Sequence, residues 1–309
     1  MVNIFRANTF LRGVMKLVGL RPQKIEIEPG TVMNIWAPTR TSDKPAVVLL
    51  HGFSLDGIHT WQFHVPSLAG KYSVYVPDFM FFGSSTTDRP ERSVAFQAQC
   101  VDRALKRLGV GRCIVAGFSY GGIVSFELAR TCPELVESLV VCGSVMTLTE
   151  SITADFFRRM GNDGLKLSGW SDLLLPDSAK GARTTLEIGT YMLPQWIPDC
   201  IFRQYQEVMS EHIKEKAELL EALVIPDDED PNKISTLSQR VHLLWGKDDK
   251  IFPMKIAISL KEKLGEKATL ESIERAGHLA MLERPIVYNR LLRKALASLI
   301  EAGAHPHSQ

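Results

Sequence analysis

The pentapeptide Gly117–Gly121 constrains the fold of this chain more than any other segment, because it has the pattern G-x-S-x-G with Ser119 at its centre. The apolar run 113–116 precedes it and the helix-like segment 123–130 follows it, which gives the order strand, tight turn, helix. Glycines two positions before and after the serine remove side chains that would clash in such a turn. The pattern predicts a nucleophilic hydroxyl that stands clear of a sheet at the positive end of a helix. The alternative is an ordinary glycine-rich turn.

Short apolar segments alternate with helix-like segments along most of the chain. This alternation predicts an α/β fold with a mostly parallel, eight-stranded sheet flanked by helices. The strand-like segments cover residues 24–27, 31–36, 46–50, 72–76, 113–116, 139–142, 241–245 and 269–273. The first two are expected to form a hairpin, and the later runs are typical of strands buried on both faces.

The alternation stops after Gly143, and a long stretch of helical pattern follows. We therefore expect two core segments, 23–144 and 236–302, with a helical cap inserted over residues 145–235. Aromatic and methionine side chains of the cap are expected to line an apolar pocket, and a plain helical core is the alternative. Residues 303–309 are expected to form a disordered tail.

The composition is that of a globular protein, with 45% hydrophobic and 23% charged residues and a formal net charge of +1 over 309 residues. This balance gives no indication of nucleic acid or of a strongly charged substrate as a partner. The five cysteines are irregularly spaced, which favours free thiols in a reducing compartment such as the cytoplasm. The sequence has no metal-binding motif and no phosphate-binding loop, so we expect no cofactor and no metal.

The N-terminal segment is basic and contains no acidic residue as far as Lys24. Its apolar residues fall at helical spacing, which predicts a basic amphipathic helix over residues 1–22 that packs on the domain. A helix that lies on a membrane surface and an organelle transit peptide are the alternatives, so a peripheral membrane contact stays open. No apolar run reaches the ~18 residues that a membrane span needs.

A serine hydroxyl needs a base to accept its proton and a carboxylate to orient that base. His278 is the expected base, because it follows the last strand-like segment and comes directly after a glycine that permits a sharp turn. The acid is expected in the loop 246–253, which follows the preceding strand. Asp248 and Asp249 are adjacent in this loop, and periodicity does not distinguish them.

The reaction also requires donors for the oxyanion that develops on the attacked carbonyl, and backbone amides provide them at fixed positions. One donor is expected from Tyr120, the residue after the nucleophile. The other is expected from Phe53, in the loop 51–54 that follows a strand-like segment. A plain turn at the end of that strand is the alternative.

At these positions the chain resembles the alpha/beta-hydrolase superfamily over nearly its whole length. The loop His51-Gly52-Phe53 is similar to the oxyanion loop of that family, and Gly117–Gly121 matches its serine motif. Asp78, followed by Phe82-Gly83-Ser84-Ser85, is similar to its D-x-x-G-x-G-x-S segment, with Ser84 where a glycine is usual.

Two further motifs near the C-terminus carry the same resemblance. Residues 246–253 are similar to G-x-x-D-x-[IV]-x-P, and this alignment implies that Asp249 is the acid. Gly277-His278, followed by Glu283 and Pro285, resembles the closing pattern G-H-x-x-x-x-E-x-P. The motifs occur in the order that the family requires.

Within the superfamily the chain most resembles capped plant hydrolases related to ABHD-type monoacylglycerol lipases and to bacterial C–C bond hydrolases. The resemblance implies a serine esterase or lipase that cleaves an ester bearing an apolar group through an acyl-enzyme. Relatives that open epoxides or displace halides use an aspartate where this chain has Ser119. The expected substrate-binding residues are Phe53, Tyr120, Met146, Trp196 and Leu279. The alternatives are a C–C bond hydrolase or lyase on the same triad, and a small-molecule receptor with this fold.

Overall fold

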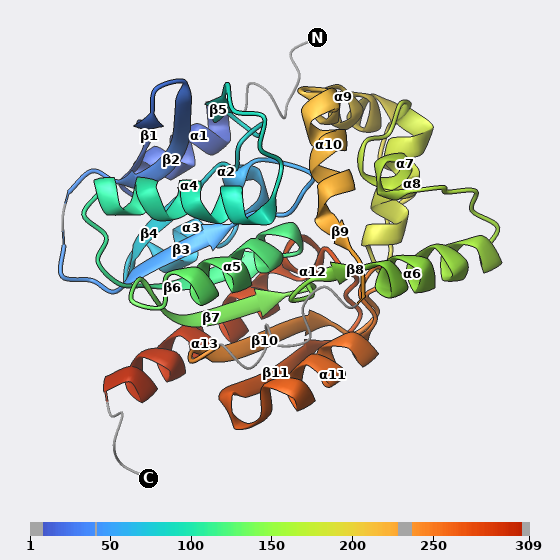
Figure 1. Ribbon diagram of the computed structural model, residues 1–309. Helices are drawn as coiled ribbons and strands as arrows, with labels where there is room; N and C mark the ends of the chain where they lie inside the picture. Colours follow the sequence, from blue (N-terminus) through green and yellow to red (C-terminus); the bar gives the residue numbers. More distant parts are fainter. Residues whose placement is uncertain (1–8, 41, 228–236, 305–309) are drawn as a thin grey trace.

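The structure is a computed structural model that describes residues 9–40, 42–227 and 237–304 (Figure 1). Its central sheet has the strand order β1-β2-β4-β3-β6-β7-β10-β11, and the short strand β5 pairs with β2. The strands are β1 (Leu20–Glu28), β2 (Thr31–Pro38), β3 (Ala46–Leu50), β4 (Ser73–Pro77), β5 (Thr86–Thr87), β6 (Cys113–Phe118), β7 (Val136–Cys142), β10 (Arg240–Gly246) and β11 (Ala268–Ile273). Pairs that involve β2 are antiparallel, and all pairs from β4 to β11 are parallel. The predicted α/β fold with a mostly parallel sheet is confirmed, but the sheet has nine strands and not eight, because the two-residue strand β5 joins it.

Helices cover both faces of this sheet (Figure 1). One face packs against α4 (Val94–Arg107), α5 (Tyr120–Thr131) and α11 (Met254–Leu264), which the short 3-10 helix η1 (Gly265–Lys267) follows. The other packs against α1 (Thr9–Leu17), α2 (Gly57–Thr60), α3 (Val65–Leu68), α12 (Ala280–Glu283) and α13 (Pro285–Ala304).

The central strands are apolar throughout because both of their faces are buried. In β3, Val48 and Leu50 belong to the hydrophobic cluster of the first face, whereas Val47 and Leu49 belong to that of the second. Consecutive side chains of a strand point to opposite faces, so neither set can be polar.

The N-terminal helix is shorter than the sequence predicts. Helix α1 ends at Leu17, and Gly19, with a φ of +88°, turns the chain into β1. Leu11 and Met15 bury one side of α1 against the domain. The first part of the predicted helix, residues 1–8, lies outside the described residues.

The C-terminal helix passes the predicted boundary between the core and the tail, which lies after residue 302. Helix α13 continues to Ala304, into the segment expected to be disordered, and residues 305–309 lie outside the described part of the chain. Among the helices that the structure describes, none has both the length and the apolar character needed to cross a membrane.

The chain between β7 and β10 is mainly helical. Its described residues form α6 (Glu150–Asn162), α7 (Trp170–Leu174), α8 (Ala179–Gly189), α9 (Asp199–Met209) and α10 (Ile213–Leu223), which we call the helical insertion. The insertion is bounded by two short strands, β8 (Leu148–Thr149) and β9 (Val224–Ile225), which pair in parallel. The sequence did not predict this pair, because strands of two residues carry no periodicity. Residues 228–236, at the end of the expected cap, are not described.

The turn between β6 and α5 packs directly against the end of β3. A Cβ atom at Gly121 would lie 2.4 Å from the carbonyl oxygen of Leu50 and 2.5 Å from that of His51. A Cβ atom at Gly117 would lie 2.4 Å from the carbonyl oxygen of Gly121. These neighbours are backbone atoms of the sheet and helix, so only glycine permits the helix to begin this close to the strand.

We expect Gly121→Ala to lower the free energy of unfolding by about 1–3 kcal/mol, because the added methyl group would overlap backbone atoms of β3. Gly111→Ala is the control, since a Cβ atom there meets nothing within 4 Å. We expect the control to change stability by no more than about 0.5 kcal/mol. Urea denaturation measures both values, and equal losses in the two variants would contradict this explanation of the turn.

Candidate active site

Ser119 occupies the strained position that its motif predicts. It lies between β6 and α5 with a φ of +52° and a ψ of −120°, a conformation that is costly for a residue with a side chain. Its backbone is fixed on both sides, because its N–H donates to the carbonyl of Cys142 at 2.9 Å and its carbonyl accepts from Ser144 Oγ at 2.6 Å. The end of β7 therefore holds the turn that presents the serine hydroxyl.

The structure brings the serine, the histidine and one aspartate together. His278 Nε2 lies 3.0 Å from Ser119 Oγ, and His278 Nδ1 lies 2.9 Å from Asp249 Oδ2. The imidazole is only 6% exposed, with the rings of Phe118 and Phe252 beside it. The three residues thus form an unbroken path for a proton from the hydroxyl to the imidazole, with a carboxylate that orients the base.

Asp249, and not Asp248, faces the histidine. The second oxygen of Asp249 accepts hydrogen bonds from the backbone N–H groups of Ile251 at 2.8 Å and Phe252 at 2.9 Å. These donors fix the orientation of the carboxylate, and their hydrogen bonds offset the free-energy cost of burying its charge. Asp248 is exposed to solvent. The structure therefore distinguishes the two aspartates that periodicity left open, in favour of the one implied by the resemblance.

The two expected oxyanion donors lie at the edge of the same pocket. Phe53 follows β3, and Tyr120 is the first residue of α5, where backbone N–H groups have no partner within the helix. Within the described parts of the chain, no hydrogen bond engages either amide. Both amides are thus available to an incoming oxygen atom, and their role as oxyanion donors stays a prediction.

His51 fixes the loop that carries Phe53. Its Nε2 accepts a hydrogen bond from the N–H of Phe79 at 3.0 Å, so Nδ1 carries the proton and donates to the carbonyl of Gly52 at 2.6 Å. Complete burial lowers the pKa of His51 to about 4, although the bond to Gly52 raises it. The imidazole is therefore neutral at neutral pH, and it holds the loop by accepting on one side and donating on the other.

Glu283 ties the turn of His278 to the helical insertion. One oxygen of its carboxylate accepts from the N–H of Gly277 at 2.7 Å, and the other accepts from the N–H of Tyr191 at 2.7 Å. A second bond joins the same segments, since Leu279 N–H donates to the carbonyl of Gly189 at 2.8 Å. The segment after α8 is thus held directly against the histidine turn.

A pocket lies in front of Ser119, between the sheet and the helical insertion, and we call it the site pocket. The residues that line it from outside the insertion are Phe53, Ser54, Phe118, Ser119, Tyr120, Ile123, Leu148, Ile251, Phe252, His278 and Leu279. Those from the insertion are Trp170, Leu174, Thr185, Leu186, Gly189, Tyr205, Leu220 and Leu223. Most of these side chains are apolar, so the pocket suits an apolar group.

Three of the five expected substrate-binding residues line the site pocket, namely Phe53, Tyr120 and Leu279. Trp196 does not, because it lies in the segment between α8 and α9 and is 81% exposed. Met146 lies instead in a neighbouring cavity, which we call the second cavity. The lining of the second cavity also includes Val94, Phe126, Ile225 and Leu237.

The sequence predicted that aromatic side chains of the cap line an apolar pocket, and Trp170 and Tyr205 do so, but it did not identify which insertion residues face the pocket. Trp170 is one of them, and its ring stacks on Phe156 at 4.7 Å while its Nε1 donates to Thr153 Oγ1 at 3.2 Å. In sequence, such residues have the same helical spacing as residues of a plain helical core. The sequence around Trp170 therefore does not show whether a given apolar residue lines a pocket or belongs to a plain helical core.

A family model of the alpha/beta hydrolase family matches residues 47–291, a range that contains Ser119, Asp249 and His278 together with both expected oxyanion donors. The chain belongs to the alpha/beta hydrolase family. The predicted resemblance is thereby confirmed, and the strand order and the turn at the serine are those of an alpha/beta hydrolase.

The hydrolase is similar to proteins of different activities. It is 25% identical over 253 residues to the dihydrolipoyllysine-residue acetyltransferase component of the acetoin cleaving system of Cupriavidus necator. The match covers 81% of this chain but only 63% of that protein, which is less than two thirds of its length. It is 26% identical over 257 residues to a 2-hydroxy-6-oxononadienedioate/2-hydroxy-6-oxononatrienedioate hydrolase of a Pseudomonas species, over 81% and 87% of the two chains. The crystal structure of a candidate lipase from Acinetobacter baumannii has a TM-score of 0.81 with 20% identity, over 95% and 96% of the chains, which supports the fold.

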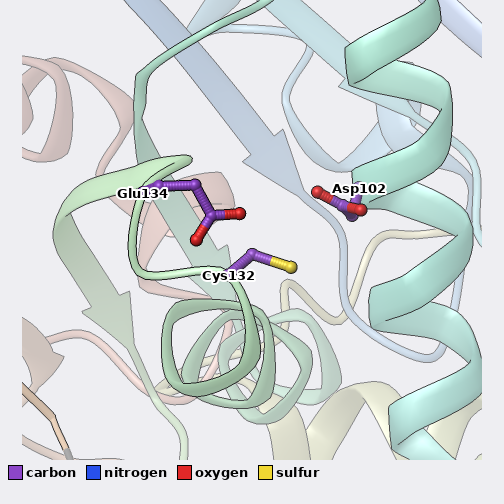
Figure 2. Close-up of side chains that lie close together, drawn as sticks. All are labelled: Asp102, Cys132 and Glu134. Atoms are coloured by element: carbon purple, nitrogen blue, oxygen red, sulfur yellow. The ribbon is translucent and has the colours of Figure 1, made fainter.

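A separate cluster of acidic and sulfur side chains lies away from the site. Figure 2 shows Asp102 on α4 close to Cys132 and Glu134, which follow α5. Lys106 Nζ donates to Asp102 at 3.0 Å and lies 3.7 Å from Glu134. Burial raises the pKa of the Cys132 thiol, which keeps it protonated. The ammonium group of Lys106 therefore compensates the carboxylates, and we assign no role in the reaction to this cluster.

We expect Asp249→Asn to slow the reaction of Ser119 with a fluorophosphonate by roughly 10⁴-fold, because an amide at this position favours the wrong tautomer of the imidazole. The matched control is Asp248→Asn, which removes the neighbouring exposed carboxylate and is expected to react at the rate of the wild type. Labelling rates followed by fluorescence measure both. A loss of the same size in the control would contradict the assignment of the acid.

We expect the free energy of unfolding to fall as the pH drops from about 6.5 to about 4, because unfolded His51 binds a proton in this window while buried His51 does not. His64, whose pKa burial also lowers to about 4, acts in the same direction. The His51→Gln variant cannot ionise and is expected to lose less stability over this window than the wild type.

Urea denaturation across this pH window tests the contribution of His51. The control is His212→Gln at an exposed position, which is expected to keep the pH dependence of the wild type. A His51→Gln variant whose stability falls as steeply as that of the control would show that His51 is not the source of the effect.

Proposed function

We propose that the protein is a serine hydrolase that cleaves an ester bearing an apolar group through an acyl-enzyme. The observation that carries this proposal is the 3.0 Å contact between Ser119 Oγ and His278 Nε2, joined to the 2.9 Å contact between the same imidazole and Asp249. A hydroxyl with a positioned base becomes a nucleophile at neutral pH, and the carboxylate stabilises the imidazolium that forms.

In this mechanism Ser119 Oγ attacks the ester carbonyl while His278 Nε2 takes the hydroxyl proton. The negative charge moves to the carbonyl oxygen, where the amides of Phe53 and Tyr120 donate hydrogen bonds. His278 then gives the proton to the departing alcohol as the C–O bond breaks and the acyl-enzyme forms. A water molecule that loses a proton to His278 then attacks the acyl carbon. The bond between this carbon and Ser119 Oγ breaks, His278 returns the proton to Oγ, and the acid is released. Asp249 orients the imidazole in both halves.

The lining of the site pocket supports an apolar group on the substrate. Trp170, Leu186 and Leu220 of the helical insertion face the pocket together with apolar residues of the core. In this proposal the helical insertion is a cap, which removes apolar substrate from water and excludes water from the reacting carbonyl. The bonds of Glu283 to the segment after α8 support a cap that is held closed over His278.

A C–C bond hydrolase on the same triad is the second candidate, because one similar protein is a hydrolase of a 2-hydroxy-6-oxo dioate. A dianionic substrate needs cationic side chains near its carboxylates. Within the described residues, the lining of the site pocket contains no lysine or arginine. This lining favours an uncharged ester over such a substrate.

We expect wild-type protein to be labelled by a fluorophosphonate and to hydrolyse p-nitrophenyl butyrate. Ser119→Ala is expected to abolish labelling and to lower kcat on the order of a millionfold, because within the described residues Ser119 carries the hydroxyl that contacts His278. The control is Ser298→Ala, an exposed position on α13, which is expected to retain both activities. Folded wild-type protein that shows neither labelling nor ester turnover would overturn the esterase proposal and favour the lyase or receptor alternatives.

A further inference from the structure

The second cavity lies directly beside the site pocket and shares part of its wall. Three apolar side chains line both spaces, namely Ile123 of α5, Leu148 of β8 and Leu223 of α10. All three are buried. The residues common to the two walls are therefore all aliphatic, with no polar group to hold a side chain in place by a hydrogen bond.

Helix α5 gives the direction in which the second cavity extends from the nucleophile. Ile123 lies one turn after Ser119, while Phe126 and Glu127, which line the second cavity, lie about one turn farther along the helix. At a rise of 1.5 Å per residue, Glu127 is about 12 Å from Ser119 along the helix axis. A group in the second cavity is thus remote from the reacting bond but in line with the site pocket.

The chemistry of the second cavity suits an uncharged chain. Its wall contains Val94, Met146 and Leu237. Met146 is one of the five residues that the sequence predicts to bind substrate. Among the described residues that line the cavity, the charged ones are Glu127 and Arg130, which bond to each other at 2.7 and 3.0 Å. Because Glu127 and Arg130 bond to each other, the described lining of the second cavity pairs the charges that it contains, and its remaining described side chains are uncharged.

We propose that the second cavity receives the distal end of a long acyl chain whose ester carbonyl is at Ser119. Ile123, Leu148 and Leu223 act as a gate between the two cavities and set the preference for chain length. This inference rests on the proposed esterase function. It predicts that the protein acts on esters of long-chain fatty acids, because burial of each added methylene in the second cavity strengthens transition-state binding by about fourfold.

The test compares kcat/KM for p-nitrophenyl butyrate and p-nitrophenyl dodecanoate, both below their aggregation limits. Ala95→Phe places a ring into the second cavity, which Ala95 lines, and is expected to lower the dodecanoate-to-butyrate ratio roughly tenfold, the value of about two buried methylenes. Leu223→Ala opens the gate and is expected to raise this ratio by a similar factor. Ala95→Phe, which lies outside the site pocket, is expected to keep butyrate hydrolysis close to that of the wild type.

Matched controls distinguish a change in the preference for acyl-chain length from a general loss of side-chain packing. Ala302→Phe adds the same ring on α13, and Leu264→Ala removes a buried leucine at the end of α11, outside both cavities. Both controls are expected to retain the wild-type ratio, and circular dichroism checks the folding of all four variants. An unchanged ratio in folded Ala95→Phe, or equal shifts in variants and controls, would overturn the inference. Absence of butyrate hydrolysis in the wild type would instead overturn the esterase proposal itself.

Discussion

The contact between His278 and the buried carboxylate of Asp249 joins the ends of adjacent strands, and the geometry of the site depends on it. Asp249 follows β10 and His278 follows β11, while Gly143 at the end of β7 lies against both side chains. A Cβ atom at Gly143 would lie 3.0 Å from His278 Nδ1 and 3.2 Å from Asp249 Oδ2. Because β6, β7, β10 and β11 are neighbours in a parallel sheet, their carboxyl ends meet at one edge and place Asp249, His278 and Ser119 side by side.

The fold could be predicted from the sequence because strands buried on both faces leave continuous apolar runs, as in β3 and β6. The order of Ser119, the acid loop and His278 could be predicted for the same reason, since each follows such a run. The choice between Asp248 and Asp249 could not be made from periodicity, because it depends on which carboxylate meets the amides of Ile251 and Phe252.

The pocket was less predictable than the triad. Trp170 and Trp196 are both aromatic residues of the segment between β7 and β10, but Trp170 is buried and Trp196 is exposed. The difference in burial arises from how the helices pack in three dimensions. The spacing of polar residues in the sequence does not reveal it. The same holds for the short strands β8 and β9, which are too brief to leave a pattern.

Two residues outside the triad, His51 and Glu283, support it from opposite sides. His51 holds the loop of Phe53 through backbone groups, and Glu283 holds the turn of His278 through backbone groups. Each position is thus set by a side chain that bonds to main-chain atoms, so the loops at the edge of the sheet keep a defined shape without regular secondary structure.

The pairing of β8 with β9 means that the chain leaves the core and returns to it at adjacent points. The helical insertion is therefore joined to the rest of the chain at one place, the β8–β9 pair, whatever the length or order of its helices. A change in the length or packing of the helices beyond this pair can therefore leave the register of the central strands, and with it the position of Ser119, unchanged.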